Sequence, residues 1–159
     1  MARDTIGKKA EDKIKDWLDR PEDGYSFDRI PDQMSGYFGS KNICDFICYK
    51  YPNVWYIESK ATWDDRFDFC EITPTQFEGL MEKSEISHVN AVVIVLFASY
   101  KRAFMIPIQE IKKRIDSGHK SINIKKIDKW DIDFHEIETV PNNRKQLLDY
   151  TGELQTIYH

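Results

Sequence analysis

The chain has 159 residues, of which 41% are hydrophobic and 31% charged, which is typical of one compact folded domain. The longest apolar run, residues 91–98, is too short to cross a bilayer, and the first residues lack the apolar core of a secretory signal. We therefore expect a cytoplasmic protein with no membrane segment. The net charge of −4 argues mildly against a nucleic-acid partner, but carboxylates that face a metal ion also count as negative, and basic residues form several local clusters.

The first half of the chain predicts a helix followed by strands. Residues 5–20 carry apolar side chains at helical spacing, and Pro21 ends this helix. Residues 31–41 contain two glycines and no periodicity, which indicates a loop or a projecting hairpin. The extended segments are residues 25–30, 42–51, 54–60 and 67–72. The second and third of these form an antiparallel hairpin around a turn at Pro52-Asn53.

The second half begins with Thr73-Pro74-Thr75-Gln76, in which Thr73 is a helix N-cap and Gln76 completes a capping box. The remaining predicted elements are a buried strand at 90–98, a strand at 103–106, a helix at 107–116, a strand at 121–124 and a short helix at 143–150. This order predicts an α/β fold with a central mixed sheet flanked by helices. We expect residues 1–120 to form the core and residues 121–159 to form a C-terminal extension packed on the same domain.

Two carboxylates and a lysine on the predicted hairpin form the candidate metal-binding and catalytic site. Because strand side chains alternate, Glu58 and Lys60 project from one face and Ile57 from the other, and Asp45 reaches the same neighbourhood from the partner strand. Two carboxylates about 4 Å apart repel by roughly 4 kcal/mol at an effective dielectric near 20. A divalent cation reverses that sign, and Mg²⁺ prefers oxygen ligands. The alternative is a salt bridge between Glu58 and Lys60 without catalytic meaning.

Two further residues could join this site, each with an equally simple structural role. Glu11 borders the apolar stripe of the first helix and could reach a metal from the side, or it could be a solvent-exposed helix carboxylate. Gln76 could contact a phosphate or a metal-bound water, or it could serve only the capping box.

The spacing of Asp45, Glu58 and Lys60, D-x(12)-E-x-K, resembles the motif of the PD-(D/E)xK nuclease superfamily, with Cys44 in place of the proline. Further segments come in the order seen in RecU-type Holliday junction resolvases, over roughly residues 5–117; they are FDRI at 27–30, CDFICY at 44–49, WYIESKAT at 55–62, ITPTQ at 72–76 and the apolar run at 91–97. The resemblance implies a restriction-endonuclease-like core in αβββαβ order.

The same resemblance implies a homodimeric, Mg²⁺-dependent endonuclease that cuts four-way DNA junctions by attack of a metal-activated water. Asp45, Glu58 and Lys60 are then catalytic, with Glu11 joining the two acidic residues as a metal ligand, and we expect Mn²⁺ to substitute for Mg²⁺. Arg29 is a candidate phosphate contact. The family's long stalk corresponds here to the short segment 31–42, which favours an alternative, a structure-nonspecific or restriction-type nuclease. A non-catalytic DNA-binding module is the third possibility.

The loop at 31–41 carries further candidate DNA contacts. Tyr37 and Phe38 lie between two glycines and could stack on unpaired bases, or they could pack in a dimer interface. Lys41 and Gln76 complete the predicted DNA-binding set.

Overall fold

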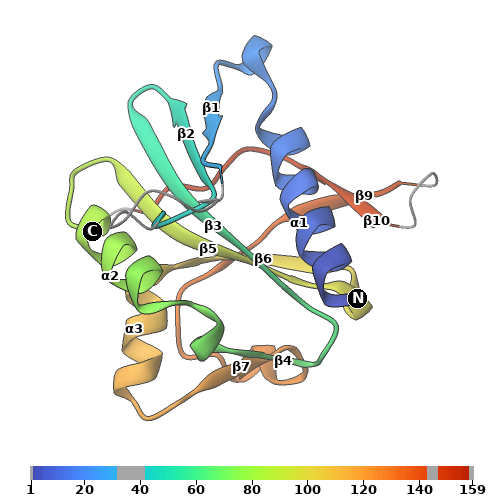
Figure 1. The fold of residues 1–159 in the computed structure, drawn as a ribbon, viewed down its shortest axis with the longest axis vertical. Helices are drawn as coiled ribbons and strands as arrows, with labels where there is room; N and C mark the ends of the chain where they lie inside the picture. Colours follow the sequence, from blue (N-terminus) through green and yellow to red (C-terminus); the bar gives the residue numbers. More distant parts are fainter. Residues whose placement is uncertain (1, 32–41, 143–146, 158–159) are drawn as a thin grey trace, which may run out of the picture.

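The computed structural model describes residues 2–31, 42–142 and 147–157 (Figure 1). The helices are α1 (Ala2–Leu18), α2 (Pro74–Ser84) and α3 (Ile108–Asp116), with short 3-10 turns η1 (Pro21–Asp23), η2 (Phe69–Glu71), η3 (Ala98–Tyr100) and η4 (Ile124–Lys129). The strands are β1 (Ser26–Arg29), β2 (Phe46–Lys50), β3 (Asn53–Thr62), β4 (Arg66–Asp68), β5 (Val89–Phe97), β6 (Arg102–Pro107), β7 (Ser121–Asn123), β8 (His135–Glu136), β9 (Glu138–Asn142) and β10 (Leu147–Thr151).

Six strands form the central sheet, in the order β1-β2-β3-β5-β6-β8. Strands β3 and β5 run parallel, paired from Val54↔Val89 to Thr62↔Phe97, and their other neighbours in this sheet run antiparallel. The predicted mixed sheet with flanking helices, in αβββαβ order, is confirmed. The strand that carries Glu58 and Lys60 is therefore hydrogen-bonded on both sides.

Each face of the sheet buries its own hydrophobic core. On one face, α1 packs its apolar stripe, including Ile14 and Trp17, against Trp55 and Ile57 of β3. On the other face, α2 and α3 pack side by side (Figure 1) with Leu80 and Ile111 turned inward. Strand β5 is buried along its whole length because both cores cover it, as the continuous apolar run predicted.

The C-terminal segment adds strands to the rest of the molecule. Strand β7 pairs with β4, β8 extends the central sheet beside β6, and β9 and β10 form a separate hairpin. The helix predicted at 143–150 is wrong from residue 147 onward, where the chain forms β10. Lys13 of α1 holds this strand through Asp149, with Nζ 2.7 Å from Oδ1. We propose on these contacts that residues 121–159 fold as one domain with residues 1–120.

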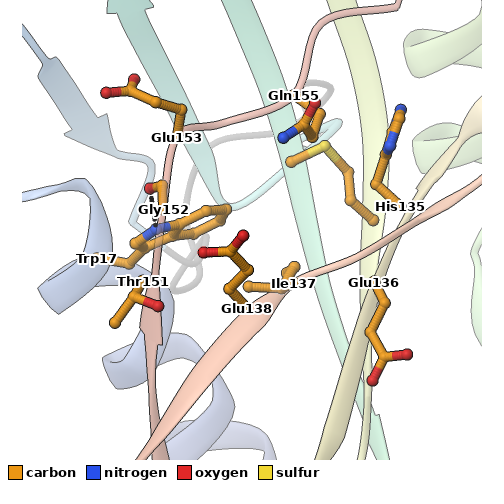
Figure 2. A pocket seen from close by; sticks show the side chains of 10 residues that line it. Trp17, His135, Glu136, Ile137, Glu138, Thr151, Gly152, Glu153 and Gln155 are labelled. Atoms are coloured by element: carbon orange, nitrogen blue, oxygen red, sulfur yellow. Dashed lines mark hydrogen bonds between the residues drawn. The ribbon is translucent and has the colours of Figure 1, made fainter.

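A pocket lies where this segment meets α1 (Figure 2), but two of its three carboxylates are already engaged. Glu136 pairs with Arg102, and Glu153 accepts hydrogen bonds from Tyr25 and Lys50. Trp17 donates its indole N–H to the carbonyl of Gly152 at 3.1 Å. The pocket is therefore part of the contact between the C-terminal segment and α1. None of the helices that the structure describes has the length and apolar character needed to cross a membrane.

Candidate active site

The site is built on β3. Glu58 and Lys60 share the face that looks toward α2, and Ile57 points into the opposite core, as alternation predicted. The Glu58 side chain is only 5% exposed, yet its Oε2 lies 3.3 Å from the Lys60 Nζ. A buried carboxylate is costly unless it is paired and hydrogen-bonded, so the surroundings of Glu58 decide what it can do.

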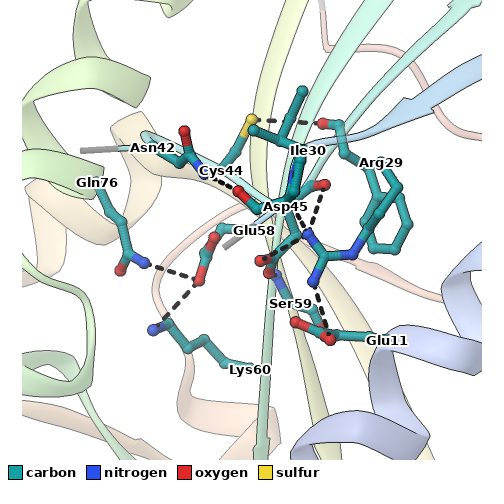
Figure 3. A network of polar contacts seen from close by, with 12 residues as sticks. Glu11, Arg29, Ile30, Asn42, Cys44, Asp45, Glu58, Ser59, Lys60 and Gln76 are labelled. Carbon is teal, nitrogen blue, oxygen red and sulfur yellow. Dashed lines mark hydrogen bonds and ion pairs between the residues drawn. The ribbon is translucent and has the colours of Figure 1, made fainter. Parts of the chain in front are cut away.

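Asp45 joins Glu58 from a bend that precedes β2. The regular strand begins only at Phe46, and the backbone N–H of Asp45 still donates to the carbonyl of Ile57 at 3.0 Å. The Asp45 Oδ2 accepts the backbone N–H of Ser59 at 2.9 Å. This contact fixes the Asp45 carboxylate next to Glu58, and the short-range polar network is visible in Figure 3.

The bend also changes where the two neighbouring cysteines lie. On a regular strand Cys44 and Cys48 would face the same side, but Cys44 is buried in the core under α2, and Cys48 is buried in the core under α1. The two thiols lie on opposite faces of the sheet because Cys44 precedes the regular strand. All three cysteines are free, and only Cys70 is exposed.

Gln76 serves the helix and the site together. Its Oε1 accepts the backbone N–H of Thr73 at 3.0 Å, which completes the predicted capping box. Its Nε2 donates to the Glu58 Oε2 at 3.0 Å (Figure 3). Opposite ends of one amide therefore serve the capping box and the contact with Glu58, and the phosphate contact of Gln76 stays a prediction.

The α2 helix approaches the Asp45 segment closely at Gly79. A side-chain Cβ at this position would collide with the Ile43 side chain, so the absence of a Cβ lets the helix and the segment pack. A glycine inside a helix costs about 1 kcal/mol relative to alanine. Sequence reasoning missed Gly79, because its importance depends on a contact across 36 residues of chain.

Burial and charge together raise the pKa of Glu58 to about 8. Removal of the carboxylate from water is the largest cause, and the nearby negative charge of Asp45 adds to it, while the Lys60 ammonium lowers the pKa. At neutral pH without a cation, Glu58 therefore holds a proton. A divalent cation beside these two carboxylates would favour the charged form, and their hard oxygen atoms are suitable Mg²⁺ ligands.

Arg29 connects Glu11 to this site. Its guanidinium Nη2 lies 3.1 Å from the Glu11 Oε2, and its Nη1 lies 3.7 Å from the Asp45 Oδ1. The structure thus links Glu11 to Asp45 through Arg29. Among the described residues, no group of three or more histidine, cysteine, aspartate or glutamate side chains is placed to share one metal ion. The metal-ligand role of Glu11 and the phosphate contact of Arg29 stay predictions.

The remaining predicted DNA contacts, Tyr37, Phe38 and Lys41, lie outside the described residues. Two contacts with the site were not anticipated from the sequence. They are the backbone N–H of Ser59, which every strand residue possesses, and the Arg29 bridge, which depends on α1 lying against β1.

A mixed sheet flanked by helices, with two carboxylates and a lysine at its central strand, is the arrangement that the resemblance to the PD-(D/E)xK nuclease class implied. A family model described as "Recombination protein U" (RecU) matches residues 26–156. The chain belongs to the RecU family, which is the Holliday junction resolvase family that the sequence resembles, and it is accordingly a DNA endonuclease. The match reaches well past residue 117, where the sequence resemblance ended, and it begins after α1.

No protein with a curated description matches this chain. Among solved structures, the chain is similar to Hjc of Archaeoglobus fulgidus, described as a Holliday junction resolvase from an archaeal hyperthermophile. The two chains are 17% identical with a TM-score of 0.46, over 65% of this chain and 78% of that one.

Proposed function

We propose that the protein cuts four-way DNA junctions with the help of Mg²⁺ held by Asp45 and Glu58. The observation that carries this proposal is the convergence of both carboxylates and the Lys60 ammonium on one polar network. The donor set fits the cation, because two mutually repelling carboxylates, one of them buried, gain from a positive charge between them. The remaining ligands would be water and phosphate oxygen, with Glu11 as the predicted third carboxylate.

Each side chain has a role in this proposal. When bound, Mg²⁺ supplies Lewis-acid stabilisation of the charge on the phosphate. Lys60 places an ammonium 3.3 Å from the Glu58 Oε2, where it stabilises negative charge that develops on a phosphate oxygen. Gln76 donates its amide N–H to the same Glu58 oxygen and so helps to hold the carboxylate. The Ser59 N–H fixes the direction of the Asp45 carboxylate.

We also propose that the protein acts as a homodimer. Symmetric cleavage of a four-way junction requires two sites related by a two-fold axis, and each chain offers one Asp45–Glu58–Lys60 network. Light scattering of the purified protein at micromolar concentration tests this: a dimer mass supports it, and a monomer that still cuts both strands of the junction contradicts it.

The cleavage test compares wild type with Asp45→Asn on a labelled four-way junction and on linear duplex of equal length, with Mg²⁺ or Mn²⁺. Asp45→Asn should abolish cleavage and keep DNA binding. The matched control is Asp28→Asn, since Asp28 is an exposed aspartate on the neighbouring strand β1, and this variant should cut normally. Equal cutting of duplex and junction would support a structure-nonspecific nuclease. Failure of the wild type to cut either substrate would refute the proposal that the protein cleaves DNA junctions.

A further inference from the structure

Positive charge is concentrated in one part of this acidic chain. Residues 99–129 contain nine basic and three acidic residues, a net charge of +6, although the whole chain carries −4. A local excess of this size on an acidic protein is characteristic of a surface that faces a polyanion. The ion pairs of the segment show which of these lysines and arginines are already engaged.

Several of the basic side chains are neutralised within the protein. On α3, Lys112 pairs with Asp116 and Lys113 with Glu110, and Arg102 pairs with Glu136. By contrast, Lys126 and Lys129 of η4 are exposed and make no ion pair with any residue that the structure describes.

The η4 turn is held rigidly beside the loop that follows the catalytic strand. Asp65 of this loop accepts a hydrogen bond from Tyr100 and pairs with Lys125 of η4, whose Nζ lies 3.0 Å from Oδ2. The backbone N–H of Ile124 donates to the Asp65 carbonyl at 2.8 Å. Below η4, Trp130 packs among the rings of the buried core, 5.3 Å from Phe104 between centroids. Contacts at both ends of η4 therefore hold the segment that carries its lysines.

The same loop presents an exposed aromatic ring. Trp63 is 48% exposed, and its carbonyl accepts the Ser99 hydroxyl at 2.7 Å. The other three tryptophans are buried. Trp63 comes three residues after Lys60, about 10 Å further along an extended chain. One DNA strand rises about 3.4 Å per nucleotide, so this distance corresponds to about three nucleotides from a phosphate held at Lys60.

We propose that Trp63, Lys126 and Lys129, here named the η4 platform, bind the sugar–phosphate backbone of the duplex arm that leaves the cleavage site. This inference rests on the proposed function, because it takes the Asp45–Glu58–Lys60 site as the place of cleavage. Charge complementarity selects the occupant, since duplex DNA carries one negative charge per 1.7 Å of helix axis. In Figure 1, β4 and β7 lie together at one end of the molecule, beyond the catalytic strand, and η4 follows β7 directly.

The test measures how junction binding depends on salt. Fluorescence anisotropy without divalent ions gives the dissociation constant of wild type, of Lys126→Gln/Lys129→Gln and of Lys112→Gln/Lys113→Gln at several KCl concentrations. Both double variants lose the same charge from the same segment, but only the first loses it from the η4 platform. Loss of two phosphate contacts should reduce the slope of log K against log salt by about 1.8, and the α3 control should keep the wild-type slope.

A second measurement locates the DNA. Because Trp63 is the exposed tryptophan, acrylamide should quench it selectively, and a bound junction should protect it; Trp63→Phe should remove this quenchable component. Three results would each overturn the η4 platform while cleavage by the wild type stands. They are a wild-type salt slope in the η4 variant, an equal reduction of the slope in both double variants, and no protection of Trp63 from acrylamide by the bound junction. Absence of cleavage by the wild type would instead refute the proposed function. Unchanged melting temperatures establish that both double variants fold.

Discussion

Replacement of Glu58 by glutamine should stabilise the metal-free protein at neutral pH. The pKa of Glu58 is raised from its ordinary value of 4.5 to about 8, with burial as the main cause. The unfolded chain therefore ionises this group between pH 4.5 and 8 while the folded chain holds the proton, so the free energy of unfolding falls as pH rises through this window. At pH 7 the loss is about 2.5 pH units at 1.36 kcal/mol each, or about 3 kcal/mol.

Glutamine has the shape and hydrogen-bonding capacity of the protonated carboxyl group but does not titrate, so Glu58→Gln should recover this free energy. Urea unfolding of wild type and variant without metal, from pH 4.5 to 8, checks it. The advantage of the variant should be about 3 kcal/mol at pH 7 and should vanish near pH 4.5. Mg²⁺ should raise the stability of the wild type alone, because ligand binding to the folded state is stabilising.

The matched control is Glu82→Gln, which changes an exposed glutamate on α2 and should alter stability by less than about 0.5 kcal/mol at every pH. A Glu58→Gln variant no more stable than wild type at pH 7 would refute the reasoning. So would an advantage that does not shrink on acidification, since titration of Glu58 would then not be its source.

Three further predictions concern the surroundings of the site. With Ellman's reagent at pH 8, Cys70 should react quickly, and the buried thiols should react only on unfolding, because burial raises the pKa of Cys44, for example, to about 12. Thr73→Ala should lower the free energy of unfolding by about 1 kcal/mol through the lost cap but leave cleavage intact. Gln76→Ala should lose the capping box and also slow cleavage. Equal cleavage rates for these two variants would contradict the role of the Gln76 amide. Gly79→Ala should lower the melting temperature and the cleavage rate, because an added methyl in a filled contact costs about 1–3 kcal/mol, against a gain of about 1 kcal/mol in helix propensity.

Side-chain alternation and capping motifs predicted those elements of the fold that depend mainly on residues close together in the sequence. Alternation placed Glu58 and Lys60 on one face of β3, and the Thr73–Gln76 capping box marked the start of α2. The region at 147–150 was wrongly predicted to be helical. Leucine favours a helix, whereas the strand pairing that prevails comes from β9 and is invisible in the segment itself.

The sequence predicted which residues form the site but only part of the geometry that joins them. The motif spacing indicated that Asp45, Glu58 and Lys60 converge, but the bend that precedes β2 follows from contacts made elsewhere. The pairing of Glu11 with Arg29 depends on how α1 lies against β1, which no spacing within either element encodes. The basic clusters were visible in the sequence, but only the ion pairs on α3 and at Asp65 separate neutralised lysines from available ones.

The position of β3 within the sheet affects how the enzyme loses activity on heating or in denaturant. Strand β5 pairs with β3 from Val54 to Thr62, and β2 pairs with it as far as Ile57, so fraying of the outermost strands β1 and β8 leaves the amides of the catalytic strand in place. Local opening at a sheet edge is commonly much easier than opening of its centre, so amide exchange of residues 57–60 should follow global unfolding. Heat or denaturant would then inactivate the protein in one step, with little loss of cleavage before the whole domain melts.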